Sequence, residues 1–258
     1  TNSCLGGELL GNEAIAKRGY QKMKDWMHLT DLNGIPVEFN SPGYARISIE
    51  VLHKLSSLVQ NEETKKRALL MRNRLALSTM LHIHHGTGRL AGPYSRGYLW
   101  EVFAITPPEI QEVRGWADDG IIPDWLTDAL DSRPEKLEVR ETAEHQAGVD
   151  ISTYHSKSFA LGVSSQELKT QSNRFIAKQS NVCISQYVVP GQERAGVFLT
   201  RYLHNDRWVG DFYSTPSRSP DFLLPEEGQF FGVQDKASMI GVYAPTELNG
   251  WDRCHSAK

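Results

Sequence analysis

Apolar side chains recur at helical spacing through the first third of the chain. Residues 12–29 place them at intervals of four, three and four on one face, behind an N-cap at Asn12. A second helix is expected over 42–59, with proline at its first position, and a third over 61–85, where Gly86 ends the pattern. The spacing therefore predicts three long helices joined by short loops.

The pattern changes after the third helix. Proline starts two shorter helices that we expect at 107–117 and 123–131. After Pro134, short alternating segments rich in β-branched and aromatic residues follow, and they predict about eight antiparallel strands. These segments read KLEVRET, VDISTYH, SFALGVS, RFIAKQ, VCISQYVV, AGVFLTRYL, FFGVQ and SMIGVYA.

Helices that precede strands favour an α+β protein with segregated layers over alternating βαβ units. We predict a helical domain over 1–133 and an antiparallel β-sandwich domain over 134–258. Neither the GxGxxG nor the GxxxxGK[ST] phosphate-binding pattern is present. A Rossmann or P-loop enzyme is therefore not expected.

The composition makes some classes of partner unexpected, nucleic acid among them. The 28 Lys and Arg against 31 Asp and Glu give a net charge of -3, so no basic field favours nucleic acid. No apolar run approaches the roughly 20 residues of a membrane-spanning helix. The three cysteines, Cys4, Cys183 and Cys254, lack the spacing of a disulfide framework or a zinc ribbon. Because the sequence starts at Thr1 without a signal peptide, we expect a processed product or an excerpt.

A glycine-rich loop reading GPYSRGY carries the most informative chemistry. Arg96 lies between Tyr94 and Tyr98, and a guanidinium beside a phenol lowers the phenol pKa from about 10, as a tyrosine base requires. The alternative is that both rings pack the loop while Arg96 pairs with a carboxylate. The segment EFNSPGY adds Asn40 beside free helix N–H groups, either as a ligand for a carboxylate or sugar hydroxyl or as part of a plain capped helix start.

Histidines cluster in LHIHHG, which we expect to be the last turn of the third helix. His84 and His85 are candidate acids or bases near neutral pH. His82 and His85 share a helical face, so they form either a metal pair or a favourable interaction with the helix dipole. With no HExxH motif, a polar pocket is favoured over a metal site, and no motif demands a cofactor.

The β region contains two dense polar clusters beside strand ends. One is Tyr154 with His155, and the other is Gln171 with Asn173 and Arg174. Six tryptophans also offer flat faces that either stack on sugar rings or pack in the core.

Taken together, EFNSPGY, LAGPYSRGY and YHSKSFALGVSSQELKTQSNRF resemble motifs of the (α/α) toroid plus β-sandwich polysaccharide lyases, of heparinase and alginate-lyase type, and of related six-hairpin carbohydrate enzymes. The resemblance implies an incomplete toroid, because too few helices are predicted for a full ring, and another chain or segment would complete it. It also favours a secreted or periplasmic location. Several of these lyase families carry an adjacent Asn-His pair that this chain lacks.

The resemblance implies β-elimination at a uronic acid of a polysaccharide or oligosaccharide. Tyr98 or Tyr94 would then act as base or acid, and Arg96 would neutralise the substrate carboxylate together with Asn40. The implied assisting and β-side residues are His84, His85, Tyr154, His155 and Asn173. Two alternatives stay open: a noncatalytic carbohydrate-binding fragment, and a glycoside hydrolase using two carboxylates. The candidate carboxylates are Glu38, Glu101, Asp118 and Asp119.

Overall fold

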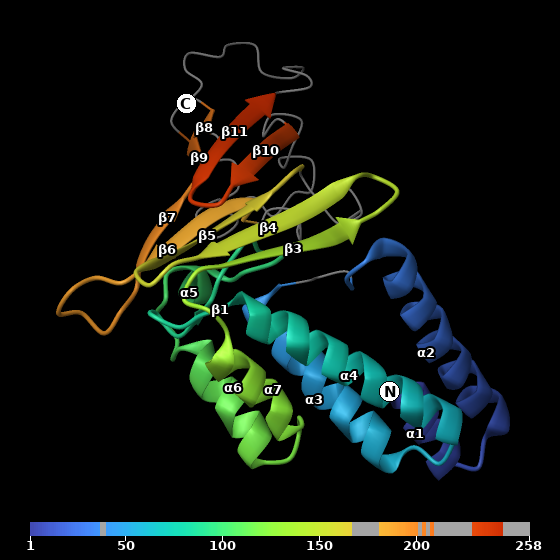
Figure 1. Cartoon of the computed structure of the whole chain (residues 1–258). Helices are drawn as coiled ribbons and strands as arrows, with labels where there is room; N and C mark the ends of the chain where they lie inside the picture. The colour runs from blue at the N-terminus through green and yellow to red at the C-terminus, as the bar shows by residue number, and fades with distance from the viewer. Residues whose placement is uncertain (37–39, 167–180, 201–202, 205–206, 209–228, 245–258) are drawn as a thin grey trace.

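The computed structural model describes residues 1–36, 40–166, 181–200, 203–204, 207–208 and 229–244 (Figure 1). The helices are α1 (Asn2–Leu9), α2 (Glu13–Asn33), α3 (Pro42–Leu58), α4 (Glu62–His82), α5 (Leu99–Val102), α6 (Glu109–Asp118) and α7 (Asp124–Ser132). The strands are β1 (Ile83–His84), β2 (Arg89–Leu90), β3 (Leu137–Glu144), β4 (Val149–His155), β5 (Phe159–Ser164), β6 (Cys183–Tyr187), β7 (Gly196–Leu199), β8 (Leu203–His204), β9 (Arg207–Trp208), β10 (Gln229–Asp235) and β11 (Ser238–Ala244). The protein is therefore α+β, as its sequence predicts.

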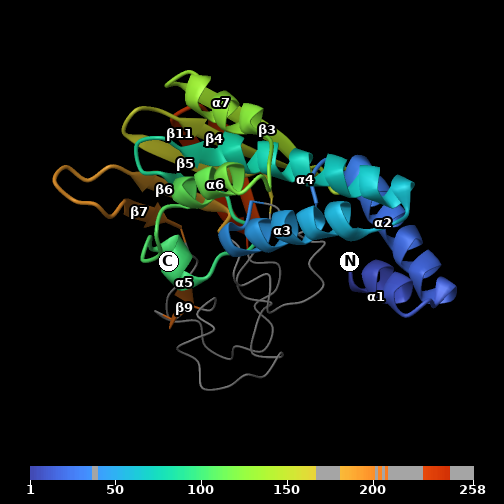
Figure 2. The same ribbon diagram turned by 90° about the horizontal axis from the view of Figure 1, so that it is seen from below.

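A five-stranded antiparallel sheet lies at the centre, with strands in the order β3-β4-β5-β6-β7. The helices lie on one side of this sheet and the β10–β11 hairpin on the other (Figure 1). The hairpin joins the sheet through Gly232, whose N–H donates to the carbonyl of Ser165 at 2.9 Å. On the helical side, α3 and α4 run side by side (Figure 2).

The helix ends follow the predicted capping chemistry. Asn12 accepts a hydrogen bond from the N–H of Ile15 at 3.1 Å, and Asn61 accepts one from the N–H of Thr64 at 2.9 Å. Gly34 closes α2 at a φ of 107°, a conformation that favours glycine. The predicted starts of α2 and α4 are confirmed.

The end of α4 differs from the prediction. The helix stops at His82, and His84 lies in β1, so the histidines do not share a last helical turn. Arg133 explains the stop, because its guanidinium donates to the carbonyls of Met80 and Leu81, at 2.9 and 2.8 Å. Carbonyls in the last turn of a helix lack the usual N–H donor four residues later, although the Met80 carbonyl also accepts from the N–H of Ile83.

The largest hydrophobic core joins both halves of the chain. It contains Ile49 and Met80 from the long helices, Trp116 from α6, Leu126 from α7 and Ile184 from β6. The segment after β2 passes through this core and is fixed between the helices and the sheet. Helix α7 ends at Ser132 and β3 begins at Leu137, while the division into two domains stays a prediction.

The close contact between β5 and this segment gives a stability prediction. A Cβ at Gly162 would lie 1.7 Å from the carbonyl oxygen of Gly92. Because the obstacle is backbone, we expect Gly162→Ala to lower the free energy of unfolding by about 3 kcal/mol in urea denaturation. The matched control is Gly115→Ala in α6, where no atom lies within 4 Å of the added carbon. That change is expected to raise stability by about 0.5–1 kcal/mol, and equal effects at both sites would contradict the packing.

Candidate functional site

Two tyrosine rings lie against one guanidinium near the start of α3, and a tryptophan stacks on one of these rings. The hydroxyls of Tyr44 and Tyr98 are 2.9 Å apart, and the guanidinium of Arg96 lies over the Tyr44 ring, 4.2 Å from its centroid. Trp100 stacks on Tyr98 with centroids 4.8 Å apart and ring planes within 3°. Trp100 is 43% exposed. We call Tyr44, Arg96, Tyr98 and Trp100 the aromatic–arginine cluster.

The Arg96 side chain also reaches the Tyr98 hydroxyl, at 3.4 Å from Nη2. A negative charge on that oxygen would face one guanidinium and one phenol hydroxyl. The cluster thus combines a hydrogen-bonded pair of phenols with a cation and a stacked indole ring.

The loop that carries Arg96 is fixed on several sides. The Asn40 amide donates to the carbonyls of Ala91 and Pro93, both at 2.8 Å. The backbone of Tyr94 pairs with that of Asn181 in an antiparallel bridge. The N–H groups of Asn40 are thus occupied in holding this loop, whereas its Oδ1 is buried without a hydrogen-bond partner. Asn40 positions the loop that carries Arg96, and its role in substrate binding stays a prediction.

Glu101 lies beneath the cluster. Its carboxylate accepts the N–H of Tyr98 at 2.9 Å and approaches Gly43, where a Cβ would lie 2.7 Å from Oε1. Burial raises the pKa of this carboxyl above 4.5, against the opposing effects of the Tyr98 N–H, Arg46, Arg89 and Arg96. A carboxyl of this kind holds a proton at higher pH than an exposed one.

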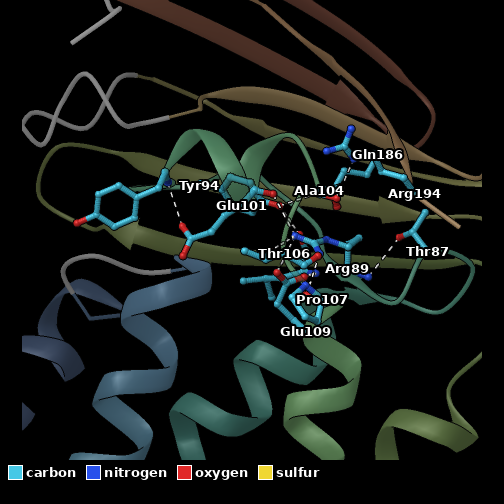
Figure 3. A network of polar contacts seen from close by, with 12 residues as sticks. Thr87, Arg89, Tyr94, Glu101, Ala104, Thr106, Pro107, Glu109, Gln186 and Arg194 are labelled. Atoms are coloured by element: carbon cyan, nitrogen blue, oxygen red, sulfur yellow. Dashed lines mark hydrogen bonds and ion pairs between the residues drawn. The ribbon is translucent and has the colours of Figure 1, made fainter. Parts of the chain in front are cut away.

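A buried ion pair of Arg89 and Glu109 lies in the polar network that also includes Glu101 (Figure 3). The Arg89 guanidinium lies 2.9 Å from Glu109 and donates to the carbonyls of Thr106, Pro107 and Glu101. Burial raises the pKa of Glu109 to about 7, although Arg89 opposes the rise. Because every contact is internal, this pair fixes the turn that follows α5.

Another buried chain of hydrogen bonds connects α4, β3, β4 and the loop. Its members, which we call the relay, are Ser78, Glu141, His82 and Thr153. Ser78 donates to Glu141 at 2.9 Å, and the same carboxylate oxygen lies 2.8 Å from Nε2 of His82. Thr153 donates to the carbonyl of Gly92 at 2.7 Å, so its oxygen must accept from Nδ1–H of His82, at 2.8 Å.

The proton positions in this relay follow from its geometry. Burial raises the pKa of Glu141, but the hydrogen bonds from His82 and Ser78 outweigh it, and the pKa lies below 4.5. The ionised carboxylate then accepts from Nε2–H of His82. The relay is a buried chain of hydrogen bonds that ends on the loop at Gly92.

Tyr94 does not join the cluster. Its ring is 2% exposed, and its hydroxyl donates to the Leu90 carbonyl and accepts from Gln186 at 2.9 Å. Burial raises its pKa far above the ordinary value, whereas a phenol beside arginine was expected to have a lowered one. Tyr94 is a core residue in this conformation.

The other histidines lie where α4 meets the sheet. His84 is buried, with Nε2 at 2.8 Å from the carbonyl of Ser156 and Nδ1 at 3.0 Å from the Thr87 hydroxyl. His155 packs on it with centroids 6.0 Å apart, and burial lowers the pKa of His155 to about 2. His85 is exposed, and its pKa is also lowered by desolvation. Within the described residues, no recorded contact joins these three side chains to the aromatic–arginine cluster.

Two predicted β-side residues are placed differently. Tyr154 lies on β4 with its ring tilted against Phe159, at a centroid separation of 6.2 Å. Asn173 lies outside the described residues, as does the candidate carboxylate Glu38.

A cavity of about 250 Å³ lies beside the cluster, between α2, α3 and α4. Trp26 and Leu75 provide apolar surface, and Tyr44 is shared with the cluster. Ser48, Ser78 and Thr79 contribute hydroxyls. This cavity was not predicted from the sequence, since its lining is drawn from three separate helices.

Comparisons with protein-family models, curated proteins and solved structures returned no match. Among the described residues, no group of three or more His, Cys, Asp or Glu side chains is arranged to hold a metal ion. None of the described helices combines the length and apolar composition needed to cross a membrane.

Tyr44 was not among the site residues predicted from the sequence, and Trp100 was included only as one of six tryptophans. Tyr44 ends the EFNSPGY segment, and Trp100 follows Tyr98 by two positions. The available signal was an aromatic residue at the end of the first motif and another just after the end of the second. Nothing in the spacing predicted that α3 would bring Tyr44 against a loop more than fifty residues later.

Proposed function

We propose that the protein is a carbohydrate-active enzyme that cleaves a uronic-acid polysaccharide by β-elimination. The observation that carries the proposal is the hydrogen-bonded pair of Tyr44 and Tyr98 with Arg96 against both rings. Elimination needs a base, an acid and a cation for the substrate carboxylate, and this group of side chains supplies all three. Trp100 adds a face on which a sugar ring can stack.

The proposed reaction proceeds as follows. Arg96 binds the carboxylate and so acidifies the proton at C5. Tyr98, as phenolate, takes that proton, and the C–H electron pair forms the double bond between C4 and C5. The C4–O bond breaks, and the leaving oxygen receives a proton from Tyr44. General acid–base catalysis of this type contributes about 10²–10⁴-fold in rate.

The same proposal includes the finer architecture. We interpret the helices as part of an (α/α) toroid and the strands as part of a β-sandwich, with another chain or segment completing the helical domain. The paired antiparallel helices and the hairpin that covers the sheet support this interpretation.

A second candidate function is glycoside hydrolysis. Glu101 favours it, because burial raises the pKa of a carboxyl that lies directly beneath Tyr98, as a general acid requires. A third reading, a noncatalytic sugar-binding fragment, uses only the stacking surface.

One experiment separates the three functions. The protein is incubated with a panel of uronate polymers, including alginate and heparinoids, and ultraviolet absorbance and reducing ends are followed together. Elimination raises both signals, because each cleavage creates a conjugated double bond on one product and a reducing end on the other. Hydrolysis raises reducing ends alone, and a binding fragment changes neither. Absence of any rise in absorbance across the panel would overturn the lyase proposal.

A further inference from the structure

The cavity beside Tyr44 has a chemical character distinct from that of the cluster. No charged side chain is among the described residues that line it. Trp26 and Leu75 form apolar surface, whereas Ser48, Ser78 and Thr79 bring hydroxyls. A pyranose has a matching division, with apolar C–H faces and hydroxyl edges. The cavity therefore suits a sugar ring in general shape and polarity.

Two of the hydroxyls can act only as acceptors toward a ligand. Ser78 already donates its proton to Glu141 at 2.9 Å, and Thr79 donates to the carbonyl of Leu75 at 2.9 Å. Each hydroxyl has one proton and two lone pairs, so what remains is acceptor capacity. A ligand must then donate O–H or N–H groups. An ionised carboxylate, which only accepts, would be desolvated here without a cation, and neither Ser78 nor Thr79 could donate to it.

We propose that this cavity binds one uncharged sugar ring next to the sugar held by the aromatic–arginine cluster. Its volume of about 250 Å³ lies below the roughly 300–1,000 Å³ of drug-sized ligand pockets, so it takes a single ring and not an oligosaccharide. Tyr44 lines the cavity and belongs to the cluster, which makes the two subsites adjacent. The assignment of a uronate to the neighbouring subsite rests on the proposed function. The substrate would accordingly place a neutral sugar beside the uronate.

Binding of two small probes tests the cavity without any turnover. Methyl glucoside and methyl glucuronide are titrated against the full chain by saturation-transfer NMR. Ser48→Leu fills the cavity, and Ala45→Val is a second lining variant in case the first one misfolds. The matched control is Ser57→Leu, the same change at an exposed position of the same helix. Arg96→Met removes the cation of the cluster.

We expect Ser48→Leu to raise the Kd of methyl glucoside about tenfold or more, with Ser57→Leu and Arg96→Met within about twofold of the parent. The Kd of methyl glucuronide should instead rise more with Arg96→Met than with Ser48→Leu. Failure of methyl glucoside to bind, or equal binding by the parent and both lining variants, would overturn the cavity proposal. If glucoside binding depends on Ser48 but no polymer is cleaved, the cavity stands and the lyase proposal fails.

Discussion

Glu141→Gln should lower the free energy of unfolding by about 3 kcal/mol at neutral pH. The substitution keeps the shape of the side chain but removes the charge that faces His82 at 2.8 Å. His82 is fully buried, and Thr153 fixes its Nδ1 as a donor. The buried Nε2–H of His82 would lose the carboxylate that accepts from it, and a buried polar group without that partner is costly, because no water replaces the lost hydrogen bond. Urea denaturation at constant m-value measures the loss.

The pH dependence has a defined sign. The folded-state pKa of Glu141 lies below its ordinary value of 4.5, so the stability from this carboxylate is present above pH 4.5 and is lost as the pH falls through the folded-state pKa. The gap in stability between the parent and Glu141→Gln should therefore narrow on acidification below pH 4.5. A gap that stayed constant across this range would contradict the lowered pKa of Glu141.

Glu138→Gln is the control for this prediction. Glu138 lies on the same strand and pairs with Arg140 at 2.7 Å, but the arginine side chain is 63% exposed. Exposed pairs contribute about 0–1 kcal/mol, because water and salt screen them. The control separates loss of a carboxylate in general from loss of the buried one that lies 2.8 Å from His82. Equal destabilisation by the two variants would show that the relay has no special role.

The sequence predicts contacts between near neighbours but not the contacts between distant segments that place Glu141 against His82. Local chemistry was sufficient for the caps at Asn12 and Asn61 and for the strand VDISTYH, because these depend on near neighbours. By contrast, both the relay and the cluster join segments far apart in the chain. His82 meets Glu141 fifty-nine positions later, and Tyr44 meets Tyr98 after fifty-four.

The same reason explains why Tyr94 and Tyr98 could not be told apart. Their spacing of four suggested a shared side of one loop. The antiparallel bridge to Asn181 instead draws Tyr94 into the core, whereas Tyr98 lies outside it against Trp100. Burial then acts in the direction opposite to that expected from Arg96, since it raises the pKa of Tyr94. Which tyrosine contacts a ligand is decided by tertiary packing.

Tyr98→Phe is expected to lower kcat about 10²–10⁴-fold on the polymer that the protein cleaves. Phenylalanine keeps the ring that stacks on Trp100 at 4.8 Å, so sugar stacking and KM should change much less. The hydroxyl removed is the atom that faces both the Tyr44 phenol at 2.9 Å and Nη2 of Arg96 at 3.4 Å. Initial rates from the ultraviolet absorbance of the new double bond, over a range of substrate concentrations, give kcat and KM separately.

Two further variants decide what a loss of rate means. Tyr187→Phe removes an exposed phenol from β6, 42% exposed, and should leave both constants unchanged. Tyr44→Phe should also reduce kcat, because the leaving oxygen would lose its proton donor while Arg96 could still bind the carboxylate. If Tyr98→Phe raises KM and leaves kcat intact, the hydroxyl contributes to binding alone. The cluster would then be a recognition surface, and the acid–base roles of both phenols would have to be abandoned.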